Sequence, residues 1–257
     1  MRSPVALGFY PQGKKELEGI VKKLLVSAHS YDALGIVVPH AGYVFSGSVA
    51  GKTYASCRTD KSNFVIFCPN HTGYGEAIAA SADEWNTPLG TIKTKGILTA
   101  DEKANKYEHS AEVQLPFLQM LHKNFTFSPV CLKHLEFEEI EKLSEKFDES
   151  NFYIASSDFI HYGPNYGYEP VERKKSLEWV KEKESELIEL ICDLNAKKFY
   201  DAVEKNNYTV CGYIPITLLL LVMKKLGAKK GIVIGRKTSY EVHKSDSFVS
   251  YAGIVFT

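Results

Sequence analysis

The chain has 257 residues, of which 44% are hydrophobic and 24% charged, a composition typical of a globular protein rather than a disordered one. Basic and acidic side chains each total 31, so no net positive charge favours binding of nucleic acid or anionic lipid. The length suits one α/β domain, and neither a repeat nor a Pro/Gly/Ser-rich linker divides it. We therefore expect a single domain over residues 1–257.

Targeting and disulfide signals are missing from the sequence. The amino terminus lacks the apolar stretch of a signal peptide, and the most apolar run, residues 216–223, is far shorter than the ~20 residues of a membrane span. We therefore expect a cytoplasmic protein. The five cysteines are widely spaced without any CxxC pair, which argues against a disulfide framework and a zinc knuckle: Cys57, Cys68, Cys131, Cys192 and Cys211.

Helical and strand patterns alternate along the chain. Helical spacing of apolar residues marks residues 14–28, and the β-branched run at 34–38 predicts a buried strand. The later predicted elements are helix 48–57, strand 64–67, short strands near 77–81 and 89–94, helix 110–122, strand 125–132, helix 136–147, strand 152–155, helices 171–193, 196–205 and 214–226, and strands 231–240 and 249–256. This alternation predicts a three-layer α/β/α fold with a mixed central sheet.

Polar side chains that can bind ligands follow three of the predicted strands. His40, His71 and Asp158 each lie two to four residues beyond the end of a different strand, and His161 comes shortly after Asp158. In open α/β sheets the carboxyl ends of the strands converge on the ligand site. Nearby prolines and glycines favour stiff, sharply turning loops, so the imidazoles are expected to be held ready for metal binding or acid/base work.

An ordered set of short motifs covers nearly the whole chain. The motifs are residues 38–47 (VPHAGYVFSG), 69–71 (PNH), 108–112 (EHSAE), 156–161 (SSDFIH) and 211–212 (CG). Together they resemble the Memo family, also called AmmeMemoRadiSam system protein B. The resemblance implies a fold similar to the class III, LigB-like extradiol dioxygenases, whose non-haem iron is held by two histidines and a glutamate. It also implies functional association with a radical SAM protein and an AMMECR-type protein.

The resemblance assigns roles to individual residues. His40 and His71 match the two histidine ligands, and His161 matches the histidine used for acid/base catalysis. Cys211 stands in place of the glutamate ligand, which puts ring-cleaving chemistry in question. Two imidazoles and a soft thiolate shift metal preference towards copper or zinc. The family has been linked to copper and redox activity, and its animal members to phosphotyrosine peptides.

Several of these residues have alternative interpretations. Cys211 is either a small buried hydrophobic residue or a thiol activated near a helix start. Asp158 is a ligand, a carboxylate that orients an imidazole, or a turn cap, and we expect the orienting role together with His161 in catalysis. His109, Asn70 and Tyr43 are possible cleft residues, although a surface ion pair is the ordinary interpretation of His109. The remaining histidines are interpreted as surface residues: His29, His122, His134 and His243.

Two functions fit these residues. The first is a metal-dependent oxidoreductase on an unknown small substrate, with copper, iron or zinc held by His40, His71 and Cys211. The second is a binding module without catalysis, in which the same cleft holds an anionic group of a small molecule or peptide, such as a phosphotyrosine-like or carboxylate group.

Overall fold

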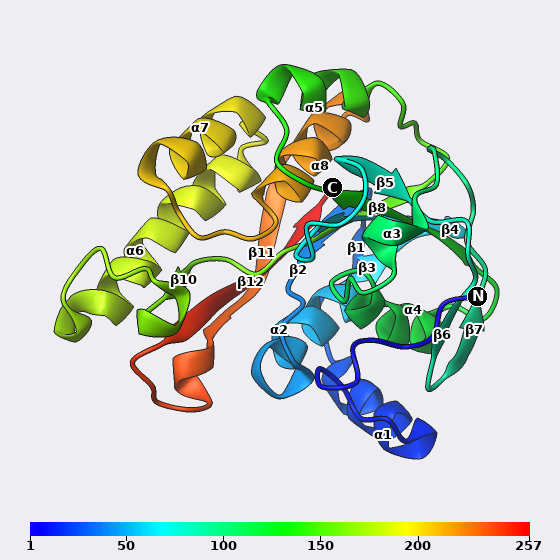
Figure 1. Ribbon diagram of the computed structural model, residues 1–257, viewed down its shortest axis with the longest axis horizontal. Helices are drawn as coiled ribbons and strands as arrows, with labels where there is room; N and C mark the ends of the chain where they lie inside the picture. The colour runs from blue at the N-terminus through cyan, green and yellow to red at the C-terminus, as the bar shows by residue number, and fades with distance from the viewer.

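An eight-stranded mixed sheet forms the centre of the protein, and the computed structural model describes all residues, 1–257 (Figure 1). The strands are β1 (Tyr31–Asp32), β2 (Gly35–Val38), β3 (Cys57–Arg58), β4 (Asn63–Pro69), β5 (Ile78–Ala80), β6 (Trp85–Thr87), β7 (Gly90–Ile92), β8 (Thr126–Leu132), β9 (Phe152–Ser156), β10 (His161–Tyr162), β11 (Gly231–Thr238) and β12 (Phe248–Phe256). The α-helices are α1 (Lys14–Leu24), α2 (Tyr43–Ala55), α3 (Glu102–Asn105), α4 (Leu115–Leu121), α5 (Phe137–Ser144), α6 (Arg173–Cys192), α7 (Ala196–Asn206) and α8 (Tyr213–Lys225). Short 3₁₀ helices are η1 (Glu112–Gln114), η2 (Pro164–Tyr166) and η3 (Ser239–Glu241).

The order of the strands places three loops side by side. Along the main sheet the order is β10-β12-β2-β9-β4-β8-β5, and β11 also pairs with β12. Strands β2, β9, β4 and β8 run parallel, whereas β5, β10 and β11 join the sheet through antiparallel pairs, as β12 does with β2. Because β2, β9 and β4 are parallel neighbours, the loops that leave their carboxyl ends lie next to one another.

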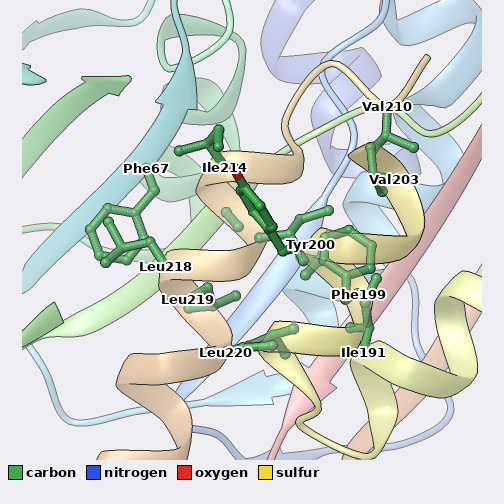
Figure 2. Packing of buried hydrophobic residues seen from close by; sticks show 14 of the residues in the cluster. Phe67, Ile191, Phe199, Tyr200, Val203, Val210, Ile214, Leu218, Leu219 and Leu220 are labelled. Carbon is green, nitrogen blue, oxygen red and sulfur yellow. The ribbon is translucent and has the colours of Figure 1, made fainter. Parts of the chain in front are cut away.

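Helices cover both faces of this sheet, so the protein has three layers (Figure 1). On one face α8 packs across β4 and β9 and contacts α5 and α7. Figure 2 shows this core, with Leu218 of α8 close to Phe67 of β4 and with Phe199 of α7 and Ile191 of α6 beside the helix. On the other face α1 packs against α2 and α4 over a second buried cluster that includes Ile36, Ile66 and Ile154 from the sheet.

The apolar patterns explain the main elements. β4 (NFVIFCP) and β12 (FVSYAGIVF) are buried at every position, as strands covered on both faces must be. α8 is almost uniformly apolar and lies inside the molecule, whereas α1 buries only a stripe that includes Leu17 and Val21. The three-layer α/β/α prediction is therefore confirmed.

Two predicted helices begin five residues away from the observed start, and the helices expected at 14–28 and 136–147 end earlier than predicted, at Leu24 and Ser144. The helix expected at 48–57 begins earlier, at Tyr43, and includes Gly47 and Gly51. Glycine usually disfavours a helix, but here it lets α2 approach α1 closely. A Cβ at Gly51 would lie 2.5 Å from the carbonyl oxygen of Leu24. The helix expected at 110–122 is instead η1 followed by α4, which starts at Leu115 with Pro116 in its first turn.

Short elements were also missed or displaced by the sequence patterns. Strands β1, β3, β6 and β10, each of two or three residues, were not predicted, and α3 has only four residues. Such elements are too short to show a hydrophobic period. No helix has both the length and the apolarity to cross a bilayer.

Candidate metal centre

The carboxyl ends of β2, β9 and β4 bring the sequence-predicted residues together. His40 lies two residues after β2, Asp158 two residues after β9, and His71 two residues after β4. His109 comes from the loop before η1. One nitrogen each of His40, His71 and His109 lies within 4.8 Å of the other two, a spacing that suits ligation of one metal ion.

His40 has a defined tautomer. The residue is buried, with 2% of its surface exposed. Its Nδ1 lies 3.0 Å from the hydroxyl oxygen of Ser156. That hydroxyl donates to the carbonyl oxygen of Ser110 at 2.8 Å and accepts from Nε2 of Gln114 at 2.9 Å. Because the Ser156 hydrogen is used, Nδ1 of His40 must donate, and the lone pair of His40 Nε2 is left free for a metal.

His71 is oriented by the fully buried carboxylate of Glu108. Its Nδ1 lies 2.9 Å from Oε1 of Glu108, and its backbone N–H donates to Oε2 at 2.7 Å. The hydroxyl and backbone N–H of Ser110 donate to the same Oε1. A carboxylate on Nδ1 fixes the orientation and the tautomer of the ring, as is usual for histidines that bind metals.

His109 lies between two aromatic rings. It stacks on Phe9 with ring centroids 4.2 Å apart and on His71 with centroids 4.9 Å apart. Its Nδ1 is 3.5 Å from Oε1 of Glu108. Glu108 therefore faces two of the three clustered imidazoles. His109 lines the cleft, and the alternative interpretation as a surface ion pair is wrong, because Glu108 and Glu112 are both fully buried.

Cys211 and Asp158 are also neighbours of His40. The Cys211 sulfur is 3.3 Å from His40 Nε2, close to the ~3.5 Å expected between sulfur and nitrogen ligands of one tetrahedral ion. Cys211 is not part of the three-histidine cluster. Asp158 Oδ1 accepts the backbone N–H groups of His40 and Ala41 at 2.8 and 3.2 Å, and its Oδ2 is 4.0 Å from His40 Nε2.

Burial sets the protonation of these groups. Burial, then the charges of His71 and His109, holds the pKa of His40 well below its ordinary range, so this imidazole is neutral and ready to ligate. Burial and the Asp158 charge raise the pKa of the Cys211 thiol well above its ordinary range. Although burial opposes it, the hydrogen bond and charge of His71 lower the pKa of Glu108 to about 2. Burial raises the pKa of Asp158, and His161 opposes that rise.

His161 is available as a base. Its Nδ1 lies 2.9 Å from the carbonyl oxygen of Phe159 and 2.8 Å from that of Thr209. Carbonyl oxygens only accept hydrogen bonds, so Nδ1 carries the hydrogen and Nε2 carries the free lone pair. Tyr166 packs against the edge of this ring, with centroids 5.0 Å apart.

An open cleft of about 420 Å³ is lined by the four histidines described above, Asp158 and Tyr166, whereas Cys211 and Glu108 lie outside its lining. The volume is within the range of small-molecule sites. The lining residues are Phe9, His40, Ala41, Gly42, Phe45, His71, His109, Asp158, His161, Tyr166, Ser239, His243, Ser245, Ser247, Val249 and Tyr251. The cleft therefore carries five imidazoles, one carboxylate and no lysine or arginine.

Two sequence-predicted cleft residues support the cleft from outside its lining. Tyr43 is buried, and its hydroxyl donates to the carbonyl oxygen of Val113 at 2.7 Å. The side-chain amide of Asn70 donates to the carbonyl oxygen of Tyr74 and accepts from Thr72 and Gly73, which shapes the turn after His71.

An amino-terminal segment closes one wall. Glu112 accepts the backbone N–H groups of Val5 and Ala6 and the hydroxyl of Tyr10, and it pairs with the buried Arg2. Phe9 belongs to this anchored segment.

Sequence reasoning missed several residues of the site, among them Glu108 and His243. Glu108 was only part of a family motif, and its place beside His109 within EHSAE was the available signal. His243 was interpreted as a surface residue; it is exposed, but it lines the cleft. The surface interpretation is wrong for His122, which is partly buried and packs on Phe64 with centroids 4.6 Å apart. His29 and His134 are exposed as expected.

The donor set fits a metal ion. His40 and His71 each have Nδ1 tied to an oxygen and Nε2 free, and a third imidazole and a thiol lie beside them. Imidazole suits zinc, copper and iron, and each of these ions accepts three or four such donors.

The fold and this site together define a three-layer α/β protein with a histidine cluster, arranged to hold a metal ion, at the carboxyl ends of its parallel strands. The Memo-like protein family matches residues 2–255, and the chain belongs to that family. A MEMO1 family protein of Methanosarcina mazei is 38% identical over 99% of this chain and 98% of its own length. A MEMO1 family protein of Archaeoglobus fulgidus is 37% identical, and one of Thermococcus onnurineus is 35% identical. Each of these two matches covers 100% of this chain and 99% of the relative.

Proposed function

We propose that the cleft is the active site of a metal-dependent oxidoreductase that acts on a small substrate. The observation that carries this proposal is the shared arrangement of His40 and His71, in which Nδ1 is tied to an oxygen and Nε2 is free at the carboxyl ends of neighbouring strands. His109 and Cys211 are the candidates for further ligands, because the first shares the histidine cluster and the second contacts His40.

The choice of the third ligand selects the metal. Three imidazoles would accept iron, copper or zinc, whereas ligation by the Cys211 thiolate favours copper or zinc. A bound ion of this group would polarise substrate oxygen and, if copper or iron, would exchange single electrons. Binding through Cys211 must release a proton, since burial keeps this thiol protonated in the free protein.

The chain's own residues divide the remaining work. His161 accepts or returns a substrate proton at Nε2, because its Nδ1 is held by two carbonyl oxygens. Asp158 orients the His40 loop through two backbone N–H groups and does not need to ligate. Phe9 and Phe45 shield part of the cleft from water.

The test combines metal analysis of protein purified without chelator with an O₂-uptake assay over a panel of catechols. We expect stoichiometric metal, and we expect His161→Gln to keep that metal while losing ~10²- to 10⁴-fold in turnover. His134→Gln, which changes an exposed histidine outside the cleft lining, is the matched control. Loss of metal from His161→Gln as complete as from His40→Ala would make His161 a ligand and overturn its assignment as a base.

The second candidate function is binding of an anionic ligand without catalysis. The cleft contains five imidazoles but no lysine or arginine, so histidine side chains would have to bind the anionic group. Metal-free protein that binds such a ligand tightly and shows no turnover with any metal would favour this function. Association with a radical SAM protein and an AMMECR-type protein stays a prediction of the family resemblance.

A further inference from the structure

The wall of the cleft formed by residues 239–247 has no role in the metal centre. This segment contains η3 and the loop to β12, and it contributes Ser239, His243, Ser245 and Ser247 to the lining. Figure 1 shows it at the end of the projecting β11–β12 ribbon, where β10 pairs with β12.

Two hydroxyls of this wall are arranged as hydrogen-bond donors. The Ser247 oxygen accepts the backbone N–H of Asn165 at 3.1 Å, and the Ser245 oxygen accepts that of Ser247 at 3.3 Å. Neither hydroxyl donates to another group of the protein, so its hydrogen is free to point into the cleft. Ser239 also accepts a backbone N–H, from Val249, but its hydroxyl is less free because it is hydrogen-bonded to the Tyr251 phenol. The exposed His243 imidazole has no hydrogen-bond partner.

The wall is held in place before any ligand binds. Gly163 has a φ of 117°, and a Cβ there would lie 2.4 Å from the Asp246 carbonyl oxygen, so the β10 turn fits tightly against the wall. Arg173 of α6 pairs with the Asp246 carboxylate at 2.5 Å, outside the cleft lining. That pairing offsets the charge of Asp246. Glu241, the other acidic residue of the wall, accepts hydrogen bonds from the backbone N–H and hydroxyl of Thr238 and lies outside the cleft lining.

The cleft is therefore polarised. Its one lining carboxylate, Asp158, lies at the metal end beside His40, while the wall of residues 239–247 offers donors and no carboxylate of its own to the cleft. An anionic group would be repelled by Asp158 and would find hydroxyl and imidazole donors at the wall.

We propose that His243, Ser245 and Ser247 form an oxyanion subsite that binds a terminal carboxylate or phosphate of the substrate while the substrate's other end faces the histidine cluster. The substrate class is therefore a small molecule with an acidic group remote from its reacting end. This inference deepens the proposed function and rests on it for the orientation of the ligand. The subsite itself needs no metal.

The test uses probes with two distinct ends. Succinic and glutaric monohydroxamates carry a metal-binding hydroxamate and a carboxylate, and the matched terminal amides lack the charge. On metal-loaded protein we expect the acid probes to bind more tightly than the amides. The double variant His243→Ala, Ser245→Ala should bind the acid probes roughly tenfold more weakly than wild type. Its affinity for the amide probes should be unchanged. His134→Ala is the control, since His134 is an exposed histidine outside the cleft lining.

A second arm separates this inference from the metal proposal. Glutarate and inorganic phosphate are titrated into metal-free protein while the histidine imidazole signals are followed by NMR, with glutaramide as the neutral control. We expect saturable shifts at His243 with at least one of the two anions, and whichever binds identifies the carboxylate or the phosphate source. If the hydroxamates bind metal-loaded and metal-free protein with equal affinity, the proposed function alone is overturned. Equal affinity of acid and amide probes, or equal loss of both in the double variant, would overturn the oxyanion subsite.

Discussion

Nδ1 of His71 lies 2.9 Å from Oε1 of Glu108, a carboxylate with no exposed surface. The same oxygen accepts two hydrogen bonds from Ser110 and lies 3.5 Å from Nδ1 of His109. The buried carboxylate of Glu108 therefore lies close to two of the three clustered imidazoles. In the proposed metal centre, Glu108 would fix the orientation of the rings rather than ligate the ion.

Replacement of Glu108 by glutamine should weaken metal binding. The amide keeps the shape of the side chain but removes the charge that holds His71, so we expect affinity to fall by ~10- to 100-fold. Competition titration against a chelator measures the change. Glu136→Gln is the control, because Glu136 is exposed and caps α5 away from the cleft. Equal metal affinity of Glu108→Gln and wild type would show that Glu108 has no part in the centre.

Glu108 should also make stability depend on pH in the metal-free protein. Its pKa is lowered from 4.5 to about 2 on folding, so the unfolded chain binds more protons in that interval. The stabilisation, about 3 kcal/mol, is complete above pH 4.5 and is lost as pH falls towards 2. Denaturant unfolding of wild type and Glu108→Gln at a series of pH values measures it. A gap between the two proteins that stays constant from neutral pH down to pH 3 would contradict the depressed pKa.

The cysteines should differ in their effect on metal binding. Cys211→Ser should weaken copper or zinc binding much more than Cys57→Ser or Cys192→Ser, because only Cys211 lies 3.3 Å from a clustered imidazole nitrogen. Cys57 instead points its thiol at the Thr53 carbonyl oxygen at 3.2 Å. Competition titration of the three variants tests the assignment. If all three bind alike, His109 is left as the third donor.

The buried pair of Arg2 and Glu112 should stabilise the amino-terminal wall. Arg2 also donates to the carbonyl oxygens of Asn105 and Glu108 and lies over the Trp85 ring at 3.8 Å. Arg2→Met leaves Glu112 buried without its cation, so the free energy of unfolding should fall by about 3–5 kcal/mol. The double variant with Glu112→Gln should recover part of that loss.

An exposed ion pair provides the control for this experiment. Arg58 and Asp32 form a salt bridge with 63% and 86% of their side chains exposed. Arg58→Met should therefore change the free energy of unfolding by less than about 1 kcal/mol. Similar losses for Arg2→Met and Arg58→Met, measured by denaturant unfolding, would contradict a structural role for the buried pair.

The fold was predictable because its main elements are long and strongly patterned. The buried strand β4 and the apolar helix α8 show their character in sequence alone. The start of α2 at Tyr43 was not predictable, because only the packing of α1 explains glycines inside a helix. The division of the helix expected at 110–122 into η1 and α4 falls just before Pro116, which lies in the first turn of α4.

The site was predictable only in part. Strand ends and motifs indicated His40, His71, Asp158 and His161, and the structure brings these residues into one cleft. The roles of Glu108 and His243 depend on loops that approach from distant parts of the chain. No local pattern shows that Glu108 loses all solvent exposure beneath His71 or that an exposed loop turns His243 towards the cleft.

The most direct test of the metal centre is long-range ¹H–¹⁵N NMR of the histidine rings during zinc titration. We expect one equivalent to bind, with Nε2 of His40 and His71 shifting as ligands while Nδ1 of each keeps its hydrogen towards Ser156 and Glu108. The rings of His161 and the exposed His134 should stay free of metal. Ligation through Nδ1 of His40 or His71, or binding unchanged in His40→Ala, would contradict a metal centre at these strand ends.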